Sequence, residues 1–308
     1  MDIKKFDSKD FFLNLGATVA LYTVVISLMN LLFTVINYAY PKVTSGYSYY
    51  NASQSISWPV AALIVVFPIF VYLMWILEKT YRHSLEARNT GIHKLLTYVT
   101  LFIAGLVVVG NLVTVLYYFL DGQDITTGFL LKVLALFVVS VSLFTYYLSD
   151  IRGTLTSKSR KGWRIFAAAL ILISIVLGFA VLGSPATQRK YKQDNHKMNN
   201  LQEINNFITS FYAENEKLPE TLNDSMGLGY YPIIIDSQTQ KPYEYIKTGD
   251  LTYSLCAEFN LPSDPKMESI SAPRDMYYYG GISGVHPAGR HCFEQTINPN
   301  TYSKAPLR

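Results

Sequence analysis

The stretch IFAAALILISIVLGFAVLG, residues 165–183, decides the fold of this chain. It carries no charge, and about twenty apolar residues are enough to cross a hydrocarbon core of about 30 Å. Four earlier stretches are also apolar over such a length, at 11–38, 59–77, 95–119 and 128–148, and Lys132 is the only charged residue among them. We therefore expect an all-α membrane bundle of five transmembrane helices in residues 1–183, followed by a polar, tyrosine-rich domain in residues 184–308.

The composition supports a membrane protein and excludes some other classes. The chain has 308 residues, of which 50% are hydrophobic and 16% are charged, whereas about 25% of the residues of soluble domains are charged. The formal net charge of +4 is small, and the basic residues gather beside the ends of the apolar stretches. We therefore expect no nucleic-acid partner.

Lysine and arginine residues predict the orientation, because cytoplasmic loops are enriched in them. The loops at 39–58 and 120–127 hold Lys42 alone, whereas the other side holds twelve basic residues. These are Lys4, Lys5, Lys9, Lys79, Arg82, Arg88, Lys94, Arg152, Lys158, Arg160, Lys161 and Arg164. The N-terminus is therefore expected in the cytoplasm, and five crossings then place the C-terminal domain outside.

Both cysteines of the chain, Cys256 and Cys292, lie in the polar domain. In an oxidising compartment two such cysteines predict one disulfide, which stabilises the domain by roughly 4 kcal/mol in the chain-entropy model. The alternative is two unrelated buried thiols.

The apolar stretches contain few polar side chains that could form a functional site. We interpret Asn30, Asn37 and Asn111 as residues that make hydrogen bonds between helices. The alternative is a substrate path, formed if these residues converge on a cavity with Lys132, the only ionisable residue within the predicted spans. No histidine lies in a span, so we expect neither haem ligation nor any other cofactor.

The polar domain has the pattern of a small α+β fold. Apolar residues at spacings of three and four predict an amphipathic helix over 188–215. Alternating patterns predict strands at 242–246, 251–259 and 290–297, which place the apolar side chains on one face and both sulfurs on the other. Two such cysteines on neighbouring strands are within disulfide reach.

Residues 188–297 resemble the globular half of type II secretion pseudopilins and type IV pilins. The similar segments are 199–208, 211–219 and 241–245, together with Asp236. The resemblance implies an amphipathic helix on an antiparallel sheet. It does not extend to filament assembly, because Ala167 stands where a processed pilin has glutamate and four helices precede this span.

Residues 11–150 resemble a bacterial family of multi-helix membrane proteins that is described only as a domain of unknown function. The similar segments are 11–17, 58–68, 101–105 and 132–135, with Tyr146-Tyr147. The resemblance implies a four-helix membrane unit and supplies no catalytic residues.

An aromatic, glycine-rich loop that contains Tyr277, Tyr278, Tyr279 and His286 is a candidate binding loop for a sugar or peptide. The alternative is a long connection whose tyrosines pack on the sheet. We expect no metal site, because a disulfide-bonded cysteine beside His286 and His291 cannot act as a ligand. Asp236 lacks the alternating acidic residues that calcium requires, so we expect it in a turn.

These observations predict a multi-pass protein of a bacterial cytoplasmic (inner) membrane. Its helices would anchor a pseudopilin-like extracytoplasmic domain that contacts an unidentified protein or cell-envelope partner. The alternative is a small transporter or channel component with the tail as a lid. We do not expect an enzyme, because no nucleophile–base pair or metal-ligand motif is present. The sequence carries no signal for the oligomeric state.

Overall fold

The structure, a computed structural model, describes residues 8–40, 56–83, 91–222, 233–263, 282 and 285–299. The described residues fall into two compact units that divide between Ser184 and Pro185. We call them the helical unit and the C-terminal unit, and each is considered by itself.

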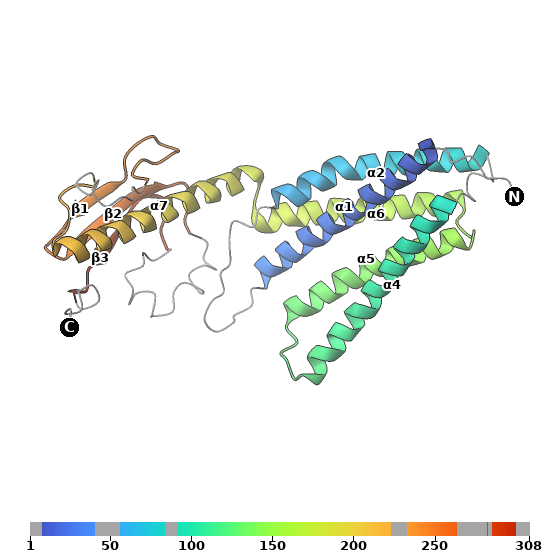
Figure 1. Ribbon diagram of the computed structural model, residues 1–308, viewed down its shortest axis with the longest axis horizontal. Coiled ribbons are helices and arrows are strands. Elements are labelled where there is room, and N and C mark those ends of the chain that lie inside the picture. Colours follow the sequence, from blue (N-terminus) through green and yellow to red (C-terminus); the bar gives the residue numbers. More distant parts are fainter. Residues whose placement is uncertain are drawn as a thin grey trace. The chain divides into compact units, whose positions relative to one another are not determined.

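The helical unit contains five helices that are long and apolar enough to cross a membrane (Figure 1). They are α1 Ser8–Ala39, α2 Ser57–His83, α4 Gly91–Leu120, α5 Thr127–Ile151 and α6 Ser157–Leu182. The prediction of five spans is therefore confirmed by length and composition. Hydropathy alone is sufficient here, because a helix satisfies all its own backbone groups and is one of the few structures that can cross lipid.

The start of α6 differs from the prediction. The helix begins at Ser157 rather than at residue 165, and the side chain of Thr156 caps it by accepting a hydrogen bond from the Ser159 amide at 3.2 Å. The basic residues from Lys158 to Arg164 are therefore helical, and do not form a loop. Apolar length marks only the part of a helix inside the hydrocarbon, so it misses charged turns that extend beyond it.

Helix α1 is central in the helical unit, where it contacts α2, α4, α5 and α6. Helices α4 and α5 form an antiparallel pair. Gly178 permits the close approach of α1 and α6, because a Cβ atom there would lie 3.0 Å from Leu31. Small residues at such contacts are typical of membrane helices, which pack without a hydrophobic driving force between them.

The C-terminal unit has one helix and a three-stranded antiparallel sheet in the order β1-β2-β3. Its elements are α7 Pro185–Asn215, β1 Glu244–Lys247, β2 Thr252–Phe259 and β3 Gly289–Thr296. Gly183 separates α7 from α6 and has φ of +86°, a conformation that favours glycine. The predicted α+β arrangement is confirmed.

The core of the C-terminal unit lies between α7 and the sheet. Leu201, Ile204 and Ile208 are fully buried on the predicted stripe of α7. They pack with the alternating residues of β2, and the buried partners from the sheet are Tyr253, Leu255, Ala257, Phe259 and Phe293. Because a fully buried leucine or isoleucine contributes about 1.5–3 kcal/mol, this stripe is a main source of the unit's stability.

Candidate functional site

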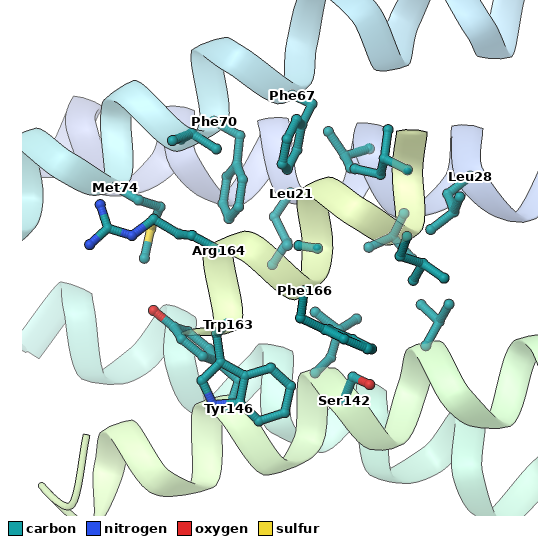
Figure 2. A pocket seen from close by; sticks show the side chains of 18 of the residues that line it. Leu21, Leu28, Phe67, Phe70, Met74, Ser142, Tyr146, Trp163, Arg164 and Phe166 are labelled. Atoms are coloured by element: carbon teal, nitrogen blue, oxygen red, sulfur yellow. The ribbon is translucent and has the colours of Figure 1, made fainter. Parts of the chain in front are cut away.

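The helical unit contains a cavity of about 140 Å³ lined by α1, α2, α5 and α6 (Figure 2). Phe67 and Phe70 of α2 lie on one side, and Leu21 and Leu28 of α1 contribute further apolar wall. The volume resembles that of an engineered apolar cavity of about 150 Å³ that stays dry and binds benzene. By size and lining, this cavity suits an apolar guest.

Aromatic side chains form part of the wall that α5 and α6 contribute. The Trp163 ring makes edge contacts with Tyr146 and Phe166, with ring centroids 6.1 and 5.9 Å apart. Ser142 also lines the cavity, but its hydroxyl donates to the Val138 carbonyl of its own helix at 2.6 Å. The interior of the cavity therefore presents few polar groups to a guest.

One end of the cavity is charged, and we call the lining residues Glu78, Arg160 and Arg164 the charged rim. Arg164 Nη2 lies 3.1 Å from Glu78 Oε2, which joins α6 to α2. Arg160 Nη2 lies 2.7 Å from Oδ1 of Asp150, a buried residue near the end of α5. These two ion pairs join the first turns of α6 to α2 and α5.

The polar residues singled out in the spans are not brought together at this cavity, whose lining contains none of Asn30, Asn37, Asn111 and Lys132. Asn111 is buried and its Nδ2 donates to the Val133 carbonyl at 2.9 Å, which joins α4 to α5. Asn30 is exposed, and Asn37 is partly buried. Only for Asn111 among the three asparagines does the structure give a side-chain hydrogen bond to another helix.

The sequence analysis missed the charged rim. Arg160 and Arg164 were used only as markers of topology, and Glu78 was not considered. The sequence does contain a signal for the rim. Glu78 and Asp150 are carboxylates beside basic helix ends, where each could be expected to pair with a basic residue.

Cys256 and Cys292 form a disulfide. They face each other across β2 and β3, with Cα atoms 4.0 Å apart. This pairing agrees with the alternation, which placed both sulfurs on the sheet face away from α7.

The candidate binding loop is described only in part, since Tyr277, Tyr278 and Tyr279 lie outside the described residues. His286 is buried, and its ring stacks on Phe259 with centroids 3.6 Å apart. Burial lowers the pKa of His286, and the hydrogen bond with the Pro287 carbonyl offsets this only in part. The histidine therefore packs as a largely neutral ring against the core.

In the part of the chain that the structure describes, no group of three or more His, Cys, Asp or Glu residues could hold a metal ion. Asp236 lies in a turn, where its carboxylate accepts hydrogen bonds from the Gln238 amide and the Thr239 hydroxyl, each at 2.9 Å. This agrees with the expectation of a turn at Asp236.

A buried lysine joins α7 to the sheet. Lys197 is 2% exposed, and its Nζ donates to the Glu258 carbonyl at 2.6 Å. The same ammonium lies 3.9 Å from Asp194 and 3.6 Å from Asp236. This cluster was not predicted from the sequence, although Asp194 and Lys197 continue the three-and-four spacing of the buried residues Leu201, Ile204 and Ile208.

The fold and these features define a multi-pass membrane protein with a disulfide-bearing C-terminal domain. Residues 10–147, which span α1 to α5, match the family model described as Domain of unknown function (DUF5671). No curated protein and no solved structure matches the chain. Because the match ends before α6, both arginines of the charged rim lie outside it.

Proposed function

We propose that the helical unit anchors the C-terminal unit on the outer side of a bacterial cytoplasmic membrane, where it binds a protein or cell-envelope partner. The observation that carries the proposal is the disulfide between Cys256 and Cys292. Disulfides persist in oxidising compartments and are rare in the cytosol. A disulfide after five spans fits an N-terminus on the cytoplasmic side.

The distribution of basic residues supports the same orientation. Lys158 and Lys161 are exposed on the first turns of α6, the end assigned to the cytoplasm. The other end of α6 leads to Arg189, Lys190 and Lys192 of α7. These three lie near the end of a span and count toward the other side, but the twelve basic residues on the cytoplasmic side still outnumber them.

We further propose that the C-terminal unit has a pseudopilin-like architecture used for contacts and not for catalysis. Support comes from the order of its elements, a long helix followed by an antiparallel sheet. The charged groups of the Lys197 cluster bond to one another, to backbone and to the side chains of Thr239 and Asn260, so they serve packing. The candidate contact surface is the loop with Tyr277, Tyr278 and Tyr279.

The orientation can be tested with the native cysteines, since the helical unit contains none. In a Cys256→Ser variant the remaining Cys292 is partly exposed and should react with a membrane-impermeant maleimide in intact cells. The matched control places a cysteine at Ser159, exposed near the start of α6, in a background without both native cysteines. It should react only in broken cells, and the reverse pattern would overturn the orientation.

The binding role is tested by cross-linking in intact cells. Alanine at Tyr277, Tyr278 and Tyr279 should abolish capture of a specific partner without changing the amount of protein in the membrane. Phenylalanine at the same three positions keeps the rings and is the matched control. Loss of abundance in the alanine variant, with capture unchanged per molecule, would assign the rings to folding instead.

The transporter alternative depends on a polar path through the bundle. Since Asn30, Asn37, Asn111 and Lys132 do not line the cavity, its lining supplies no such path. The anchor is therefore the function that the geometry supports best.

A further inference from the structure

The cavity in the helical unit has a lining that changes character from one end to the other. Most of its wall is apolar or aromatic, whereas Arg160 and Arg164 lie at the charged rim. The wall also reaches the surface of the helical unit, because Phe166, which lines it, is 43% exposed. This arrangement suits an amphiphile with an apolar chain and an anionic group.

The rim arginines keep hydrogen-bonding capacity for an anion. A guanidinium has five N–H donors. Arg160 donates from Nη2 to Asp150, and Arg164 donates from Nη2 to Glu78 and from Nε to the Arg160 carbonyl. Within the described residues, the remaining N–H groups of both arginines have no acceptor, and the side chains are 17% and 33% exposed.

Glu78 and Asp150 balance the charges of the two arginines, so the excess positive charge at this end comes from nearby lysines. Lys158 and Lys161 are exposed on the same turns of α6, and the first turn of α6 contains no acidic residue. Basic residues at a helix N-terminus oppose the helix dipole, so these turns stabilise the helix poorly. Membrane topology accounts for the exposed lysines, whereas Arg160 and Arg164 also line the cavity.

We propose that the cavity binds an anionic phospholipid. A segment of one acyl chain would lie among the apolar and aromatic residues, and the phosphate would lie against Arg160 and Arg164. In a bilayer, acyl chains are the apolar molecules available to fill such a space. Guanidinium groups bind phosphate through paired, charge-assisted hydrogen bonds. This lipid site is separate from the anchoring role proposed above.

The site can be observed through Trp163, whose ring lines the cavity. The other tryptophans, Trp58 and Trp75, are replaced by phenylalanine, and the full chain is placed in phosphatidylcholine vesicles. Phosphatidylglycerol with brominated acyl chains should quench Trp163 and saturate at a low mole fraction. Brominated phosphatidylcholine should quench only in proportion to its amount, and equal saturable quenching by both lipids would overturn the proposal.

Two paired variants separate the site from general surface charge. Glu78→Gln with Arg164→Gln leaves the net charge unchanged, strands no carboxylate, and should weaken the saturable quenching about tenfold. Lys158→Gln with Lys161→Gln lowers the net charge by two and should change it less than about twofold. If the lysine pair has the larger effect, the lipid is held by surface charge and the proposal fails.

A third variant tests whether the acyl chain of the lipid lies in the cavity. Ala167→Leu narrows the cavity and should reduce the quenching by brominated phosphatidylglycerol, while circular dichroism and size-exclusion profiles stay unchanged. Unchanged affinity in this correctly folded variant would place the acyl chain outside the cavity.

Discussion

The helical unit and the C-terminal unit are held together by different interactions. In the helical unit, most hydroxyl side chains for which hydrogen bonds are known bond to a carbonyl one turn earlier in their own helix. Examples are Thr18, Thr23, Thr34, Thr80, Thr114, Ser142, Thr145 and Ser174. In the C-terminal unit, polar side chains such as Lys197 and Asn205 bond between elements.

The difference reflects the solvent that each unit meets. In water, burial of apolar surface contributes about 25 cal/mol per Å² and drives α7 onto the sheet. In lipid that driving force between helices is absent. Close packing at residues such as Gly178 and a few hydrogen bonds therefore stabilise the contacts between helices. Changes to polar contacts should therefore affect the C-terminal unit strongly and the helical unit weakly.

The largest effect is expected at Lys197. Lys197→Met leaves the carboxylates of Asp194 and Asp236 without their buried cation, and removal of one partner of a buried ion pair costs about 3–5 kcal/mol. Pulse proteolysis of the full chain in urea should show a lower midpoint for the C-terminal unit. Lys192→Met, at an exposed position of α7, is the control and should leave the midpoint unchanged.

A companion variant sharpens this result. Adding Asp194→Asn to Lys197→Met removes one of the uncompensated charges and should recover part of the loss. If Lys192→Met and Lys197→Met lower the midpoint equally, the buried cluster has no special role.

The disulfide should have an effect of comparable size. It joins residues 36 positions apart, and loss of such a link costs roughly 4 kcal/mol in the chain-entropy model. Replacing Cys256 and Cys292 by serine should lower the urea midpoint of the C-terminal unit. Reductant should lower that of the unmodified protein equally, without affecting the double variant.

The same experiment separates the two units, because all three tryptophans lie in the helical unit. Tryptophan fluorescence should therefore show no change on reduction. A shift in that signal would mean that the two units unfold together.

These contrasts also explain what the sequence could predict. The five spans follow from apolar length, and the strands follow from alternation, as in Tyr253, Leu255 and Ala257. The cavity and its rim depend on which faces of α2, α5 and α6 meet, and hydropathy carries no information on that. Lys197 was predictable in principle, because its spacing from Leu201 places a charge on the buried stripe.

A smaller effect is expected from pH at His286. Burial lowers its pKa in the folded state, whereas the unfolded chain binds a proton near the ordinary value of about 6.5. As the pH falls through that value, the unfolded state binds a proton at this histidine, whereas the folded state does not. The free energy of unfolding therefore decreases. The urea midpoint of the C-terminal unit should therefore fall between about pH 7.5 and about pH 5.5.

Four neighbouring groups act on His286. Phe259 and Pro287 contact the ring, while Asp194 and His291 act through their charges. The Pro287 carbonyl and Asp194 favour protonation, whereas His291 opposes it. His286→Phe should remove most of the pH dependence, whereas His196→Gln, at an exposed position of α7, should retain it. If the urea midpoint of His286→Phe depends on pH as it does in the unmodified protein, the titration belongs to another group.

The smallest effect is expected in the helical unit, at Asn111. Its hydrogen bond to the Val133 carbonyl joins α4 and α5, yet such bonds in membrane proteins average about 0.6 kcal/mol, because the unfolded helices in lipid also find partners. Asn111→Ala should lower the stability of the helical unit by about that amount, followed by tryptophan fluorescence during denaturation in detergent. Thr114→Ala, whose hydroxyl bonds only within α4, is the control and should have no effect. A loss at Asn111 as large as that at Lys197 would show that polar contacts carry similar weight in both units, which would remove the distinction drawn between them.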